Sequence, residues 1–180
     1  NSLGHAHPRL TKVIAEQAAS LIHISNLYIN EPSIALADEL AKISGMDRVF
    51  FSNSGAEANE AALKCARRYQ TVVHGRAEKT GILAFNDSFH GRTFGALSVT
   101  GQPKYHHGFE PLVPGVSFVR FGDLAAVDAA LDAGNGTIGT IIVEPIQCEG
   151  GINMPPAGFL EGLRARADRD GIVLIFDEVQ

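Results

Sequence analysis

The chain has 180 residues, of which 45% are hydrophobic and 19% charged, and its formal net charge is −5. This composition is typical of a globular domain and excludes intrinsic disorder, which requires few apolar residues and a high net charge. The acidic balance argues against a nucleic-acid partner, because phosphate contacts need a basic surface. No run approaches the roughly 18 apolar residues of a spanning helix, so we expect no membrane partner either.

The two cysteines, Cys65 and Cys148, are too few for a disulfide framework and indicate a reducing compartment. We therefore expect a cytoplasmic protein, and the cysteine spacing predicts no metal site. The sequence begins at Asn1 without a methionine and stops at Gln180, directly after an apolar run. Because domain ends are usually exposed and poorly ordered, we interpret the chain as a fragment of a larger protein.

Apolar residues recur at three- and four-residue spacing in some stretches, which predicts helices, and form short continuous runs in others, which predicts strands. In chain order the expected elements are helices at 8–24 and 33–43, a strand at 48–51, a helix at 56–69, strands at 81–85 and 116–121, a helix at 124–131, a strand at 138–144, a helix at 159–169 and a strand at 172–176. Continuous apolar strands that alternate with helices predict an α/β fold, a mostly parallel sheet covered on both faces in three α/β/α layers.

Polar or Gly-rich segments follow four of the expected strands, at residues 52–57, 87–92, 144–151 and 177–180. In open parallel sheets, ligands bind beyond the carboxyl ends of the strands. The long segment 86–114 has little regular signal, and loops of this length are usually functional. These positions together predict a small-molecule site at one edge of the sheet.

Two of these segments allow a functional and a structural interpretation. The turn Ser54-Gly55-Ala56 enters a helix, whose exposed N–H groups and dipole can hold a phosphate. Alternatively, Ser54 only caps that helix in an S-x-x-E box with Glu57. Asp177 follows a buried strand and needs a partner to stay ionised, which is either a protonated ring nitrogen of a cofactor or the backbone of a turn that it caps.

The other two segments also allow both a functional and a structural interpretation. Phe89 offers an aromatic face for a planar heterocycle and Arg92 a fork for a carboxylate, but such a pair by itself is more often a core Phe beside a surface Arg. His90 by itself is more typical of a hydrogen-bonded structural residue than of a catalyst. Glu149, in a Gly-rich loop, either neutralises a nearby cation or is a solvated acid.

Taken together, these segments resemble the class III (ornithine/acetylornithine-type) aminotransferases, which use pyridoxal 5′-phosphate. The resemblance spans essentially the whole chain, and the ordered set of motifs is highly specific. The matching segments are residues 2–8, 25–28, 53–62, 88–93, 100–105, 111–115, 144–151 and 177–180.

This resemblance implies the large domain of a fold-type I pyridoxal-phosphate-dependent transferase. Residues 1–30 would be an N-terminal helix and loop entering that domain, and residues 31–180 a partial cofactor-binding domain. The family's Schiff-base lysine lies beyond Gln180, so we expect the fragment to contain no catalytic residue and to be inactive alone. Cys148 departs from the family pattern, which has Gly there.

The resemblance also implies roles for individual residues. The cofactor-binding set is Ser54, Gly55, Ala56, Phe89, His90, Asp177, Val179 and Gln180. Gly55 and Ala56 would bind the phosphate through backbone amides, Phe89 would stack on the pyridine ring, Asp177 would pair with the ring nitrogen and Gln180 would bind the phenolic oxygen.

Two further residues would bind substrate. Arg92 would hold a substrate carboxylate, and Glu149 would pair with an arginine beyond Gln180.

The implied activity is transfer of the δ-amino group of N-acetylornithine to 2-oxoglutarate, in arginine biosynthesis, by a homodimer. The alternatives are a related aminotransferase that acts on ornithine, succinyl-diaminopimelate or 4-aminobutyrate, and a non-catalytic protein that retains the cofactor pocket. A dinucleotide-binding module is disfavoured, because the sequence contains no G-x-G-x-x-G.

Overall fold

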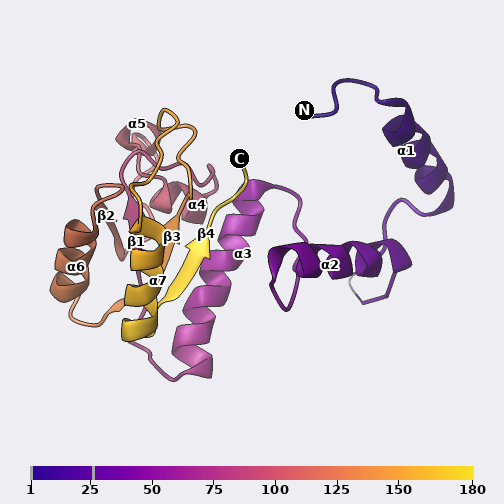
Figure 1. Ribbon diagram of the computed structural model, residues 1–180. Coiled ribbons are helices and arrows are strands. Elements are labelled where there is room, and N and C mark those ends of the chain that lie inside the picture. Colours follow the sequence, from indigo (N-terminus) through magenta and orange to yellow (C-terminus); the bar gives the residue numbers. More distant parts are fainter. Residues whose placement is uncertain (1, 26) are drawn as a thin grey trace. The chain divides into compact units, whose positions relative to one another are not determined.

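The computed structural model describes residues 2–25 and 27–180, so Asn26 of the segment 25–28 lies outside the described residues. The chain divides into two compact units, one up to Phe50 and one from Phe51 on (Figure 1). The division at residue 30 that the family resemblance implies stays a prediction.

The first unit contains two helices, α1 (Pro8–Ser20) and α2 (Glu31–Ser44). Helix α2 is capped at its start by Asn30, whose side chain accepts a hydrogen bond from the Ser33 amide, and at its end by Gly45 in the left-handed conformation. Helix α1 ends four residues earlier than the expected range 8–24.

The expected strand at 48–51 is wrong, because these residues form irregular chain. A strand needs a neighbour to satisfy its backbone groups, and within the described ranges none pairs with this segment. The side chain of Phe50 is accordingly 74% exposed. The run 48–51 has the apolar pattern of a strand, but no described strand pairs with it.

The second unit is built on a four-stranded sheet in the order β2-β1-β3-β4, with every neighbouring pair parallel. Its strands are β1 (Gly81–Phe85), β2 (Val116–Val119), β3 (Ile138–Val143) and β4 (Val173–Phe176). Its helices are α3 (Gly55–Arg68), α4 (Phe94–Val99), α5 (Pro103–His106), α6 (Leu124–Ala133) and α7 (Phe159–Asp170), and a π-helical turn, η1 (Tyr69–Val73), extends α3. The other predicted helices and strands are confirmed, with ends that agree to within about two residues.

Alternate residues of the central strands pack on opposite faces of the sheet, as a two-residue side-chain period requires. Leu83 and Phe85 of β1 join a core cluster with α6 and α7, whereas Ile82 and Ala84 join one with α3 and α4. Helices therefore cover both faces (Figure 1), and the predicted three-layer α/β/α arrangement is confirmed.

The segment 86–114, which carried little regular signal, contains the short helices α4 and α5. The N-terminus of α4 is capped from another helix, because Glu60 of α3 accepts hydrogen bonds from the amides of Gly95 (2.7 Å) and Ala96 (3.1 Å). The side chain of Thr93 donates to the same Glu60 oxygen at 2.6 Å. A cap supplied from a distant residue leaves no local sequence signature.

The strand order creates a crevice between β1 and β3. The chain leaves β1 toward β2 on one side, whereas it leaves β3 toward β4 on the other side. At such a switch point the loops beyond the carboxyl ends diverge and leave room for a ligand.

Candidate functional site

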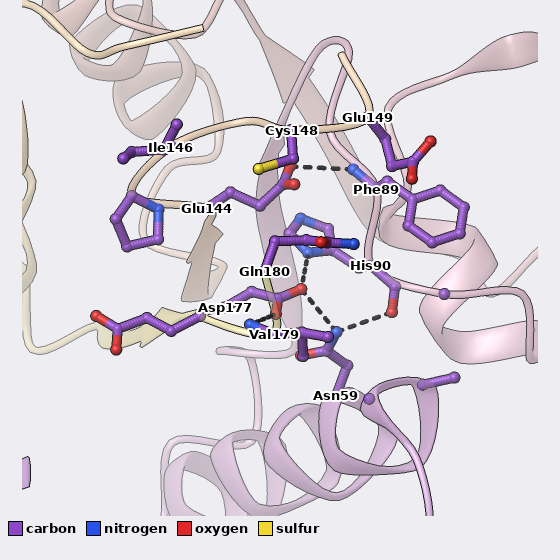
Figure 2. A pocket seen from close by; sticks show the side chains of 15 residues that line it. Asn59, Phe89, His90, Glu144, Ile146, Cys148, Glu149, Asp177, Val179 and Gln180 are labelled. Carbon is purple, nitrogen blue, oxygen red and sulfur yellow. Dashed lines mark hydrogen bonds and ion pairs between the residues drawn. The ribbon is translucent and has the colours of Figure 1, made fainter. Parts of the chain in front are cut away.

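A cavity of about 380 Å³ lies at this edge of the sheet (Figure 2). Its walls come from the start of α3 and from the segments that follow β1, β3 and β4. Its lining residues are Gly55, Ala56, Asn59, Phe89, His90, Gly91, Glu144, Pro145, Ile146, Cys148, Glu149, Asp177, Glu178, Val179 and Gln180.

Most residues that the sequence analysis assigned to a site line this cavity, namely Gly55, Ala56, Phe89, His90, Glu149, Asp177, Val179 and Gln180. Ser54 and Arg92 do not line it. The four segments predicted to meet at one edge of the sheet do meet there, and the role of each residue stays a prediction.

At the start of α3 the structure has the capping geometry. The Ser54 hydroxyl accepts a hydrogen bond from the Glu57 amide (3.2 Å), and the Glu57 carboxylate accepts one from the Asn53 amide (2.7 Å). The amides of Gly55 and Ala56 belong to the first helical turn, which has no acceptors within the helix. Together with the positive end of the helix dipole, they form a place where an anion fits.

The helix start and the segment after β4 approach each other closely at Gly55. A Cβ atom on Gly55 would lie 3.0 Å from both Val179 methyl carbons. The loop after β1 also packs against this helix start, because a Cβ on Gly91 would lie 2.7 Å from that of Ala56. The cavity wall therefore depends on glycines at two points of contact.

Asp177 is the central charged group of the cavity, with 8% of its surface exposed. Its Oδ2 accepts hydrogen bonds from Asn59 Nδ2 and His90 Nδ1, both at 2.8 Å, and its Oδ1 accepts one from the Val179 amide at 3.2 Å (Figure 2). Burial opposes ionisation, but the hydrogen bonds from His90 and Asn59 outweigh it and lower the pKa of Asp177 below its ordinary value. The carboxyl group is therefore ionised at neutral pH.

Glu144 is a second buried acid in the cavity, with 5% of its surface exposed. Its Oε2 accepts a hydrogen bond from the Phe89 amide at 3.0 Å (Figure 2). Burial raises the pKa of Glu144 above its ordinary value, although the Phe89 amide opposes this. The environments of Glu144 and Asp177 thus shift the pKa values of two nearby carboxyl groups in opposite directions.

Sequence reasoning did not assign Asn59 or Glu144 to the site. Asn59 follows Gly55 and Ala56 by three to four residues, so it lies on the same face of α3, and this spacing was an available signal. Glu144 begins the segment 144–151, which the sequence analysis had already placed at the edge of the sheet.

Arg92 lies beside the cavity. Its guanidinium is 4.1 Å from the ring centroid of Tyr105 and 6.0 Å from that of Phe89. The two rings meet edge to face, with centroids 5.9 Å apart. The exposed Arg92 is thus held next to Phe89 by aromatic contacts.

Neither a metal centre nor a membrane span was found in the part of the chain that the structure describes. No group of three or more His, Cys, Asp and Glu residues there is arranged to hold a metal ion. No helix there is long and apolar enough to cross a membrane.

Comparison with known proteins gives the family. The family model described as "Aminotransferase class-III" matches residues 1–180. The chain belongs to the class-III aminotransferase family. The parallel sheet between two helical layers is the fold-type I architecture of these pyridoxal-phosphate transaminases.

This class-III aminotransferase chain is 47% identical over 180 residues to the acetylornithine aminotransferase of Methanocaldococcus jannaschii, covering 100% of this chain and 44% of the relative. It is 48% identical over 179 residues to the acetylornithine/succinyldiaminopimelate aminotransferase of Yersinia pestis, covering 99% and 43%. Among solved structures, an amine transaminase from an uncultivated Pseudomonas species in its PLP-bound form matches with a TM-score of 0.91 and 29% identity, covering 97% of this chain and 45% of that one. The chain therefore spans less than half the length of these relatives.

Proposed function

We propose that the complete protein is a pyridoxal-phosphate-dependent aminotransferase that moves the δ-amino group of N-acetylornithine to 2-oxoglutarate. The observation that carries this proposal is the buried, ionised Asp177, which faces a cavity at the switch point of the sheet. The names of the relatives from Methanocaldococcus jannaschii and Yersinia pestis support the choice of amino donor.

The cavity residues fit pyridoxal 5′-phosphate. No lysine or arginine occurs among the described residues that line the cavity, so neither of these permanently charged side chains balances the charge of Asp177 there. A protonated pyridine nitrogen supplies a cationic partner. The amides of Gly55 and Ala56 would hold the phosphate, the Phe89 ring would lie against the pyridine ring, and Gln180 would bind the phenolic oxygen.

When bound, pyridoxal phosphate supplies an electron sink that stabilises negative charge on the carbon next to the reacting nitrogen. Asp177 would favour this by holding the proton on the ring nitrogen. Glu144 would fix the loop that carries Phe89, because it accepts the hydrogen bond of the Phe89 amide.

Substrate would be recognised at the mouth of the cavity. Arg92, whose guanidinium lies over the ring of Tyr105, would bind a carboxylate of the amino donor. Glu149 is exposed at the cavity edge and would neutralise an arginine from a part of the protein outside this chain. We also propose that the protein is a cytoplasmic homodimer that acts in arginine biosynthesis.

The main alternative donor is succinyl-diaminopimelate. It is favoured by the name of the Yersinia pestis relative, which includes both acylated diamino acids. Both donors contain an acylated α-amino acid group with a carboxylate, so Arg92 and Glu149 by themselves do not discriminate between them.

The experiment that tests this function is borohydride reduction of the complete protein with pyridoxal phosphate, followed by peptide mapping. We expect one pyridoxyl-lysine and amino transfer to 2-oxoglutarate that is fastest with N-acetylornithine in a panel with ornithine, succinyl-diaminopimelate and 4-aminobutyrate. Faster transfer from another donor would refute N-acetylornithine as the preferred amino donor. If no lysine is labelled in the presence of excess cofactor, the protein is non-catalytic and the proposed activity is refuted.

A further inference from the structure

We propose that Asn59 and His90 are positioning residues that fix the orientation and charge of Asp177, and so act on the bound cofactor through that carboxylate. This inference deepens the proposed function and rests on it. It concerns Asn59, which has no role so far, and His90, which the family resemblance places in the cofactor-binding set without a stated action.

Both hydrogens of the Asn59 amide group are donated in hydrogen bonds. Its Nδ2 donates to Asp177 Oδ2 and to the backbone oxygen of His90, each at 2.8 Å. The opposite amide orientation would point Oδ1 at two acceptors, so only this orientation satisfies the contacts. With 5% of its surface exposed, Asn59 connects α3 to the segments that follow β1 and β4.

His90 is held from its backbone and from its ring. Its amide donates to Thr100 Oγ1 at 2.9 Å, and its ring Nδ1 lies 2.8 Å from Asp177 Oδ2. An ionised carboxylate only accepts hydrogen bonds, so the hydrogen of this pair resides on Nδ1.

The other ring nitrogen of His90 makes no competing contact in the described chain. Nε2 is buried and has no hydrogen-bond partner among the described residues, and His90 is only 2% exposed. Among the described residues, the only hydrogen bond of the His90 ring is therefore the one from Nδ1 to Asp177, which orients both side chains.

These contacts leave Asp177 little freedom. Asn59 and His90 both donate to Oδ2, and the Val179 amide donates to Oδ1 from the same segment of chain. Loss of Asn59 removes one donor and the link between α3 and the loop after β1. Because hydrogen bonds to charged groups are strong, we expect a roughly 10- to 100-fold loss of cofactor affinity.

The test uses Asn59→Leu in the complete protein, with pyridoxal phosphate affinity measured by equilibrium dialysis, alongside kcat and KM. The matched control is Gln70→Leu, because Gln70 is also a fully buried amide with two backbone acceptors, Gly139 O (2.9 Å) and Gly171 O (2.8 Å). Those acceptors lie at the start of β3 and just before β4, away from the cavity.

We expect Asn59→Leu to weaken cofactor binding roughly 10- to 100-fold and to lower kcat, with KM for the amino donor almost unchanged, whereas Gln70→Leu changes only stability. In an Asp177→Ala background, Asn59→Leu should weaken cofactor binding no further, because it acts through Asp177. An equal loss in both backgrounds, or equal affinities of the Asn59→Leu and Gln70→Leu proteins, would overturn the proposal.

A second pair of variants covers the case in which Asn59→Leu does not fold. His90→Gln retains a side-chain donor and His90→Leu does not, so we expect His90→Gln to bind pyridoxal phosphate more tightly than His90→Leu. Equal affinities would count against the role of His90. A wild-type protein that takes up no cofactor would instead refute the proposed function, whereas normal uptake with unaffected variants would refute the positioning role alone.

Discussion

Gly91→Ala is the substitution for which the structure gives the clearest expected cost. Gly91 has a φ of +120°, which side-chain-bearing residues rarely adopt, and an added Cβ would lie 2.7 Å from Ala56 Cβ and 2.9 Å from its Cα. It would also lie 3.2 Å from Ala96 Cβ. Backbone strain of about 1–3 kcal/mol and overpacking of about 1–3 kcal/mol both destabilise the fold, which gives a total of about 2–6 kcal/mol.

Gly108→Ala isolates the first of these two contributions. Gly108 has a φ of +86°, and nothing lies within 4 Å of the position of an added Cβ. We expect this variant to lose about 1–3 kcal/mol from strain alone. The free energy of unfolding of the two variants, measured by urea denaturation of the complete protein, should therefore differ by about 1–3 kcal/mol. If both variants lose the same amount, the loop after β1 does not pack against the start of α3 as described.

Three further substitutions have definite expected outcomes. Burial raises the pKa of Glu144 in the folded state, so ionisation of this acid destabilises the fold. The protonated acid makes its full contribution to stability below the unfolded-state pKa, and this contribution is lost as pH rises through the folded-state pKa. The stability of Glu144→Gln relative to wild type should therefore increase between pH 4 and pH 8 in thermal unfolding, and a flat difference would contradict the burial argument. Glu60→Ala removes the cap of α4 and should cost about 1–2 kcal/mol in urea denaturation, whereas exposed Glu161→Ala should cost less than about 0.5 kcal/mol. Phe159→Ala, at a side chain that is 1% exposed, should cost about 3–5 kcal/mol by the same measurement; a loss below about 1 kcal/mol would show that α7 does not pack on the sheet.

The sequence alone indicated most of the architecture, because the relevant signals are local. The runs at 81–85 and 138–144 are apolar at nearly every position, as strands covered on both faces must be. The capping pair Ser54 and Glu57 marked the start of α3 in the sequence, and the structure has both of its hydrogen bonds. The same local logic was wrong at 48–51, since an apolar run becomes a strand only if a neighbouring strand pairs with it.

The sequence also determined which segments meet, because residues that follow parallel strands necessarily lie at one edge of the sheet. Phe89, Glu149 and Asp177 could therefore be assigned to one site from the sequence alone, and all three line the cavity. The ordered motifs likewise indicated the family, since they span the whole chain.

Only the tertiary structure decided how the charges in that cavity are arranged. Asn59 and Asp177 are 118 positions apart in sequence, and His90 and Asp177 are 87 apart, so no local spacing predicts their hydrogen bonds. The pKa of a carboxyl group depends on its burial and on the donors that reach it, which is why Asp177 and Glu144 are shifted in opposite directions at one edge of one sheet. The chain order determines the neighbourhood of these side chains, whereas packing in three dimensions determines their charge.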